Sequence, residues 1–197
     1  MNDLDKLYRF IENHVSLSED IKERLSGEIK HIHFKKGDKV VELGRTSSTL
    51  YFVVSGIYRV YKLHEGKEIT GYFNVKDRNP FVASFVSLLT QTPSKEIVEC
   101  IQDGELLSIS YAKWKQFYQI SESLNTFGRI TAEYNYVLAI ERIEALQYQS
   151  AADRYNAFLK IYPNLINQIP HHYIASYIGI TPESLSRLRK SLTKSDS

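Results

Sequence analysis

The side chains best suited to specific chemistry lie near the end of the sequence, where polar residues share one face of a predicted helix. They are Glu183, Ser184, Ser186, Arg187, Arg189 and Lys190. An arginine can donate to guanine O6 and N7, a glutamate can accept from cytosine N4, and serine and lysine can hold phosphates. The pattern favours double-stranded DNA as a partner. The alternative is an ordinary helical hairpin whose polar side is simply exposed to water.

The flanking sequence predicts a helix-turn-helix that would present this face. Within residues 171–192 apolar residues recur at helical spacing. Ala175 allows two helices to cross closely, and Gly179 tolerates the positive φ that the turn needs. Thr181 is placed to cap the second helix, and Pro182 stands at its first position. Because the crossing, turn and cap residues agree, we prefer DNA binding to the simple hairpin.

This segment resembles the DNA-binding end of the cyclic-AMP receptor protein/FNR (Crp/Fnr) family of bacterial transcription regulators. The resemblance places Pro182, Glu183 and Arg187 where the family reads bases. It places Thr181 where the family contacts a phosphate. Pro182 stands where a basic residue is common, so the family's usual target sequence is not expected. The family continues into a β-hairpin wing, but this sequence stops soon after Leu192, so no wing is expected C-terminal to the motif.

Composition indicates a soluble globular protein without a cofactor. The chain has 197 residues, of which 43% are hydrophobic. Its one cysteine, Cys100, excludes an internal disulfide and any four-thiolate metal or iron–sulfur site within one chain. No Ser, His and acid set has a recognisable catalytic spacing, so we expect no enzyme, no metal and no cofactor. With no leader and no membrane-length apolar run, we expect a cytoplasmic protein that does not enter a membrane.

The excess positive charge falls where the proposed partner would bind. The charged residues of 171–197 are Arg187, Arg189, Lys190, Lys194, Glu183 and Asp196. Four basic minus two acidic residues leave +2, which equals the net charge of the whole chain. Since neutralising phosphates supplies much of the affinity for DNA, so small a patch predicts strong salt dependence and a need for two copies.

Residues 29–109 change to short β-rich runs punctuated by glycine, which predict an antiparallel barrel or jelly roll. Two short amphipathic helices within residues 4–25 are expected to cover it. The region resembles the family's cyclic-nucleotide-binding β-roll through the segments FKKGD (34–38), YFVVSG (51–56) and GKE (66–68). The expected fold class is α+β, with this β-roll, a long dimerisation helix and the helix-turn-helix.

The side chains that hold a cyclic nucleotide in the family are missing here. Nucleotide-binding members use a Gly-Glu pair on the ribose and an Arg followed by a small hydroxyl residue on the phosphate. The matching positions, together with those of the adenine-contacting hydroxyls, hold Ala83, Ser84, Ser94, Lys95, Ala139 and Ile140. Lys95 could still pair with a phosphate as a point charge. We therefore expect no control by cyclic AMP, and the pocket is either a filled core or a site for an unidentified small molecule.

A long helix without proline is predicted over residues 121–149. It carries a stripe that comprises Leu124, Phe127, Ile130 or Thr131, Tyr134, Leu138, Glu141 and Ala145. Such a stripe packs either on the chain's own β-roll or on a second copy. The resemblance to the family implies a parallel two-fold pair, with Glu141 and Arg142 at its rim, and we prefer it because two recognition helices must lie about 34 Å apart on a dimeric operator.

Together these patterns predict a homodimeric DNA-binding transcriptional regulator, with RNA polymerase as a candidate further partner. We expect a sensory β-roll at 1–120, the dimerisation helix at 121–150 and the DNA-binding domain at 151–197. One alternative is a small-molecule-sensing β-roll with a vestigial DNA-binding tail. Another is a cupin-like metalloenzyme built on His31 and His33. No second cupin motif is present, so we interpret these histidines as strand residues with one exposed side chain.

Overall fold

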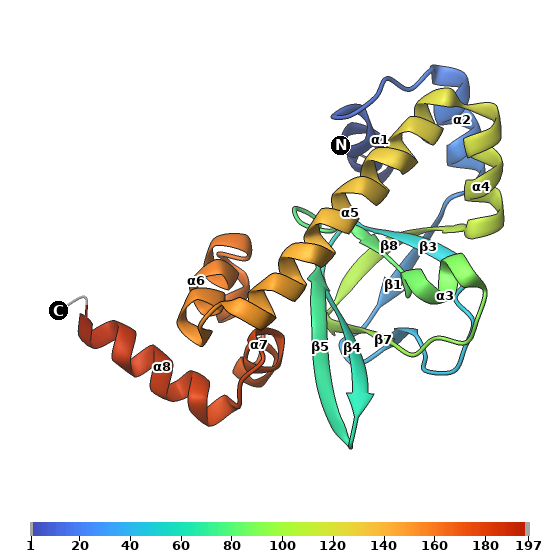
Figure 1. Ribbon diagram of the computed structural model, residues 1–197. Helices are drawn as coiled ribbons and strands as arrows, with labels where there is room; N and C mark the ends of the chain where they lie inside the picture. The colour runs from blue at the N-terminus through green and yellow to red at the C-terminus, as the bar shows by residue number, and fades with distance from the viewer. Residues whose placement is uncertain (1, 196–197) are drawn as a thin grey trace.

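The β-roll consists of two antiparallel four-stranded sheets (Figure 1). The computed structural model describes residues 2–195, and within them the strand orders are β1-β8-β3-β6 and β2-β7-β4-β5. The strands are β1 (Lys30–Phe34), β2 (Lys39–Val41), β3 (Thr49–Val53), β4 (Ile57–His64), β5 (Lys67–Asn74), β6 (Phe81–Val82), β7 (Ile97–Gln102) and β8 (Gly104–Ser110). The predicted α+β fold with a β-roll is confirmed.

Apolar side chains from both sheets fill the space between them. Val53 and Leu106 come from one sheet, and Tyr58, Val60 and Val98 come from the other. Because successive side chains of a strand point to opposite faces, β4 directs Tyr58 and Val60 inward and the intervening residue outward. The roll is therefore closed by its own core.

Two glycines allow the backbone between β3 and β4 to approach the backbone at the start of β8 closely. A Cβ added to Gly104 would lie 2.3 Å from the carbonyl oxygen of Ser55. One added to Gly56, whose φ is 88°, would lie 2.8 Å from the Cα of Gly104. Only glycine fits at either position, since both contacts are with backbone atoms.

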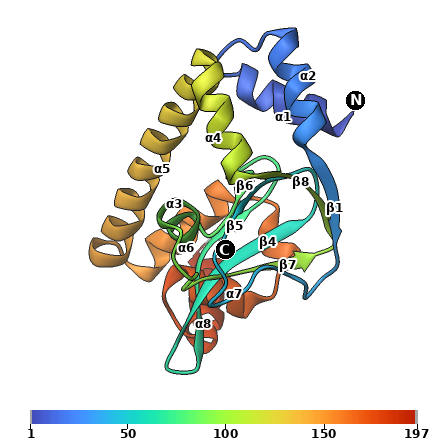
Figure 2. The ribbon, with the colours of Figure 1, turned by 90° about the vertical axis from the view of Figure 1, so that its right-hand side faces the viewer.

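The N-terminal helices cover the outer face of the first sheet (Figure 2). Helix α1 (Asp3–Glu12) contributes Leu7, and α2 (Glu19–Glu28) contributes Leu25 to a core shared with β3 and β8. Ser18 caps α2 by accepting a hydrogen bond from the backbone of Ile21. The predicted covering helices are confirmed.

The remaining helices follow α2 along the chain. They are α3 (Phe85–Thr90), α4 (Tyr111–Ile120), α5 (Glu122–Tyr148), α6 (Ala151–Ile161), the 3-10 helix η1 (Leu165–Asn167), α7 (His171–Ile178) and α8 (Pro182–Ser195). Helix α5 has 27 residues and runs from the N-terminal helices to α6 and α7 (Figure 1). Ser121 caps it through a hydrogen bond from the backbone of Leu124, as expected for a long helix that starts there.

The buried and the exposed apolar residues of α5 lie in different parts of the helix. Leu124 and Phe127 are buried in the core beneath the N-terminal helices. They head the stripe that was predicted to pair with a second copy, so that prediction is wrong for these two residues. The exposed large apolar residues of α5 are Tyr134, Tyr136, Val137, Ile140, Ile143, Leu146 and Tyr148. A sequence stripe alone did not show which apolar side would face the chain's own body.

Arg142 lies against α7. Its guanidinium is 4.1 Å from the centroid of the Tyr177 ring and donates to the Tyr177 carbonyl. Its position at the rim of a helix pair stays a prediction, because it depends on a second copy of the chain. The contact fixes the end of α5 to the first helix of the helix-turn-helix.

The break between α5 and α6 is held by specific hydrogen bonds. Ser150 and Asp153 form a reciprocal capping box at the start of α6. Arg154 donates from Nε to the carbonyl of Ile178 at 2.6 Å and from Nη1 to the carbonyl of Gln149 at 2.5 Å. One side chain thus joins the end of α5, α6 and the end of α7.

None of the helices described between residues 2 and 195 has the length and apolar content that crossing a membrane requires.

Candidate nucleic-acid interface

The turn of the helix-turn-helix is set by the backbone at Gly179. This residue is left-handed, with φ 73° and ψ 38°. Its N–H donates to the carbonyl of Ser176, and the N–H of Ile180 donates to that of Ala175. This pair of bonds is a Schellman motif, which ends α7 sharply and satisfies its last carbonyls. The predicted role of Gly179 is confirmed.

The two helices cross over a small apolar core. Ile174, Ala175 and Ile178 of α7 and Leu185 of α8 are all almost completely buried. Ala175 has no exposed surface, in agreement with its predicted place at the helix crossing. The angle of α8 is therefore fixed by packing as well as by the turn.

The start of α8 is capped as the sequence predicts. The hydroxyl oxygen of Thr181 accepts a hydrogen bond from the backbone N–H of Ser184 at 3.2 Å, and Pro182 is the first helical residue. Hydrogen bonds with its own backbone N–H and with the Thr181 hydroxyl lower the pKa of Glu183. Glu183 therefore stays an ionised acceptor at neutral pH.

Four of the eight predicted residues form one exposed stripe along α8. Glu183, Ser186, Arg187 and Lys190 stand at i, i+3, i+4 and i+7, which places them on the same side of a helix. All four are exposed, at the far end of the molecule from the N-terminal helices (Figure 1). We call these four residues the reading stripe.

The other predicted residues flank the reading stripe. Pro182 is exposed, while Ser184 and Arg189 are partly buried. Ser184 accepts a hydrogen bond from Arg187 Nη2 at 3.3 Å. Arg189 Nη1 lies 2.9 Å from Nε2 of His171, at the start of α7. Arg189 is thus directed to the neighbouring helix and not along the stripe.

The last charges predicted for this surface, those of Lys194 and Asp196, lie outside the residues whose side chains are described. The described part of α8 still carries three basic side chains against Glu183. No strand lies in the described chain between α6 and Ser195, so no wing is present in that stretch.

Two residues of the predicted nucleotide cassette contact Glu96, a residue that the sequence reasoning missed. Ser84 and Ser94 are buried and both contact Glu96. Ser84 donates from Oγ to Glu96 Oε2 at 3.1 Å, and Ser94 donates to the Glu96 carbonyl at 2.7 Å. Lys62 lies 3.6 Å from the same carboxylate. Glu96 follows directly after Ser94 and Lys95 in the sequence, but its hydrogen bond with Ser84 was not evident without the fold.

The other members of the predicted pocket have different surroundings. Ala83 is buried in the apolar core, and Lys95 is exposed. Ala139 and Ile140 are exposed on α5. The structure thus brings Ser84 and Ser94 together around Glu96, whereas Lys95, Ala139 and Ile140 are directed to solvent.

The two strand histidines have separate acidic neighbours. His33 Nδ1 lies 3.1 Å from Glu105 Oε1, and His31 Nδ1 lies 3.7 Å from Asp3 Oδ2. Both are exposed, because residues two apart in a strand share a face, so the expectation of one exposed side chain is wrong. Over residues 2–195 no group of three or more His, Cys, Asp or Glu residues could hold a metal ion.

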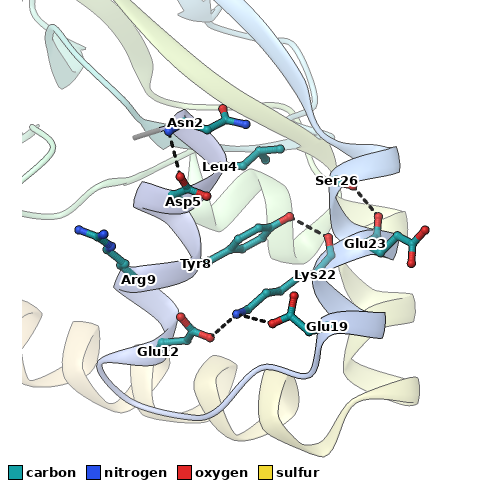
Figure 3. Close-up of a pocket in the computed structure, with 10 residues that line it drawn as sticks. All are labelled: Asn2, Leu4, Asp5, Tyr8, Arg9, Glu12, Glu19, Lys22, Glu23 and Ser26. Carbon is teal, nitrogen blue, oxygen red and sulfur yellow. Dashed lines mark hydrogen bonds and ion pairs between the residues drawn. The ribbon is translucent and has the colours of Figure 1, made fainter.

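A cleft of about 560 Å³ lies between α1 and α2 (Figure 3). Its central polar groups are already paired with one another. Lys22 Nζ is 2.8 Å from Glu12 and 3.0 Å from Glu19, and the Tyr8 hydroxyl donates to the Lys22 carbonyl at 2.7 Å. The cleft therefore offers no evident set of free groups for a ligand.

Comparisons with known proteins agree with this architecture. Residues 31–121 match the family model described as "Cyclic nucleotide-binding domain". No curated protein sequence matches the chain. Among solved structures, CLP of Xanthomonas campestris, described as a c-di-GMP responsive global regulator, is 18% identical, with coverage of 91% of this chain and 93% of that chain and a TM-score of 0.70.

Two further structures show the same similarity. FixK2 from Bradyrhizobium japonicum is 18% identical, with 85% and 86% of the two chains covered and a TM-score of 0.70. A protein from Eubacterium rectale, described as a regulator of the Crp/Fnr family, is 21% identical, with 91% and 85% covered and a TM-score of 0.70. Residues 31–121 are therefore a cyclic nucleotide-binding-type domain, and the chain as a whole has the fold of the Crp/Fnr transcriptional regulators.

Proposed function

We propose that this protein is a homodimeric, DNA-binding transcriptional regulator that is not controlled by cyclic AMP. The observation that carries the proposal is the reading stripe, which is exposed on a helix held by a cap and a Schellman turn. A rigid, exposed helix with Arg and Glu on one side suits the major groove. The division at residues 120 and 150 into sensory, dimerisation and DNA-binding parts belongs to this proposal.

In the proposed mechanism, residues of α8 divide between base reading and phosphate binding. Arg187 donates to a guanine, and the ionised Glu183 accepts from a cytosine. Lys190, Ser186 and Thr181 contact phosphates, which fix the register of the helix on the duplex. Pro182 adds an apolar contact at the start of the helix, and the flanking Ser184 and Arg189 complete the interface.

The homodimer is proposed to form through the exposed side of α5. Tyr136, Ile140 and Ile143 stand at i, i+4 and i+7, which is the spacing of a coiled-coil seam. Two parallel α5 helices would carry two copies of α8 to one side of the pair. Successive major grooves on one side of a duplex lie about 34 Å apart, which matches a two-fold operator. RNA polymerase is a proposed partner of the promoter-bound dimer.

The proposed loss of cyclic-nucleotide control is supported by the residues at the cassette positions. Ser84 stands where the family's ribose-binding glutamate lies, and Ser94 and Lys95 stand near the position of its phosphate-binding arginine. The guanidinium that would neutralise the phosphate by a bidentate contact is therefore missing. Calorimetric titration should detect no binding of cyclic AMP or cyclic GMP. Cyclic di-GMP should be included, because CLP is described as responsive to it. Micromolar binding of cyclic AMP or cyclic GMP would contradict this part of the proposal, whereas binding of cyclic di-GMP alone would identify a different effector.

DNA binding is tested by selecting bound sequences from random duplexes with the purified protein, which should enrich a palindrome. On the selected site, Arg187→Ala should weaken binding by about 1–3 kcal/mol and relax the choice of one base pair. Lys190→Ala should weaken all sequences alike and reduce the salt dependence. Lys95→Ala, which removes an exposed lysine outside α8, is the matched control. Equal losses on selected and random DNA for both α8 variants would contradict the assignment of base reading.

We also propose that the protein is not an enzyme and acts in the cytoplasm, where its DNA partner is found. The buried thiol of Cys100 supports the first point, since burial raises its pKa to about 11 and keeps it protonated.

A further inference from the structure

Helix α7 is docked on the β-roll of its own chain through a buried arginine. Arg59 of β4 is 1% exposed. Its guanidinium lies 4.0 Å from the centroid of the Tyr61 ring and 3.6 Å from that of Tyr173, which belongs to α7. Arg59 Nη2 also contacts Glu68 at 2.6 Å and Glu99 at 2.8 Å. The positive charge is thus held by two carboxylates and covered by an aromatic ring of the helix-turn-helix.

A serine of α7 makes a second contact at the edge of the sheet. Strand β5 is the last strand of its sheet, so its outer N–H and carbonyl groups have no strand partner. Ser176 Oγ accepts from the N–H of Thr70 and donates to the carbonyl of Glu68, both at 2.8 Å. One hydroxyl therefore satisfies two backbone groups of β5.

An aromatic cluster extends the same contact. The ring of Phe73 in β5 lies 5.9 Å from that of Tyr162 and 5.7 Å from that of Tyr177. The Tyr162 hydroxyl donates to the Phe73 carbonyl at 3.2 Å. Apolar, aromatic and hydrogen-bonding contacts thus act at one surface, which consists of β4 and β5.

We infer that this surface of β4 and β5 is a docking site for the chain's own helix-turn-helix, and that Arg59 and Tyr173 are the pair that holds it. The orientation of α8 is then set directly by the β-roll and not by α5 alone. The reading stripe stays exposed in the docked position, so the contact orients the helix without covering it. Strand β4 contacts the interior of the roll through Tyr58 and Val60 and contacts α7 through Arg59.

The inference is tested by measuring the distance between the two parts in solution without DNA. Spin labels are attached at Lys67→Cys on β5 and Lys160→Cys on α6, both exposed positions, while the buried Cys100 should stay unlabelled. The labelled protein is mixed with an excess of unlabelled protein, so that pairs of labels within one chain dominate, and double electron–electron resonance should then give one narrow distance distribution. Tyr173→Ala should broaden it, because the ring that covers Arg59 is lost. Tyr173→Phe, which keeps the ring, should restore the narrow distribution.

Two further variants keep the test decisive. Ser176→Ala removes a single hydroxyl with little risk to folding and should also broaden the distribution. Tyr148→Ala, at an 81% exposed aromatic position on α5, is the control and should leave it narrow. The inference is overturned if Tyr173→Ala and Ser176→Ala are both as narrow as the unmodified protein, or if Tyr173→Phe is as broad as Tyr173→Ala. Since no DNA is present, failure here is distinct from failure of the proposed DNA binding.

Discussion

Replacing Ile143 with glutamate tests whether two α5 helices pair through their exposed side. Ile143 is 50% exposed in the single chain, and its neighbours on the same side, Tyr136 and Ile140, are 69% and 39% exposed. A parallel pair would remove these side chains from water. The substitution would set two carboxylates near each other across the two-fold axis.

The expected magnitude follows from the surface that remains to be buried. Burying a whole isoleucine side chain contributes about 1.5–3 kcal/mol, so the exposed half of Ile143 contributes about 1 kcal/mol per copy and about 2 kcal/mol per dimer. Since about 1.4 kcal/mol is a tenfold change in an equilibrium constant, Ile143→Glu should weaken the dimer at least about 30-fold. Burial of two carboxylates would add to this loss.

Sedimentation equilibrium over a range of protein concentrations measures the change directly. Leu43→Glu is the matched control, because Leu43 is also 50% exposed but lies between β2 and β3. Circular dichroism establishes that both variants are folded. The reasoning is refuted if the dimer constant of Ile143→Glu equals that of the unmodified protein, or if the control weakens the dimer equally.

Three other predictions concern stability. Gly179→Ala should lower the free energy of unfolding by about 1–2 kcal/mol, because alanine is disfavoured at a φ of 73°. An unchanged thermal unfolding temperature would contradict this cost. In urea, Thr181→Ala should cost about 1 kcal/mol and Ser186→Ala less than about 0.5 kcal/mol; equal losses would show that the cap contributes nothing. Burial alone would raise the pKa of Glu99, but hydrogen bonding led by Arg59 outweighs it and lowers the pKa. The pairing stabilises the folded protein above the ordinary carboxyl pKa of about 4.3, and this stabilisation is lost as the pH falls through the lower pKa of folded Glu99. Glu99→Gln should therefore reduce the dependence of the unfolding free energy on pH in this acid range, and an unchanged dependence would be inconsistent with the pairing.

The helix-turn-helix was predictable because its signals are local. A left-handed residue, a cap and an N-terminal proline act within a few positions of one another, so Gly179, Thr181 and Pro182 specify the turn without knowledge of the rest of the fold. The glycine-punctuated β pattern likewise predicted the roll, although not the order of its strands.

The contacts made across strands were not predictable in the same way. Arg59 pairs with Glu99 because the two are directly opposite in the ladder of β4 and β7. That register depends on residues about forty positions apart in the sequence. The same holds for Glu96, which meets Ser84 only after α3 folds back. Likewise, α5 has apolar residues on both sides, and only tertiary packing determines which side remains exposed.

Two arginines have a mechanical consequence for the C-terminal half of the chain. Arg142 attaches the last turns of α5 to α7, and Arg154 bridges the carbonyls of Gln149 and Ile178. Although helix α5 ends at Tyr148, these two side chains hold the junction between α5 and α6 against α7. A rotation or shift of the last turns of α5 would therefore move α7, and with it α8, in the same direction.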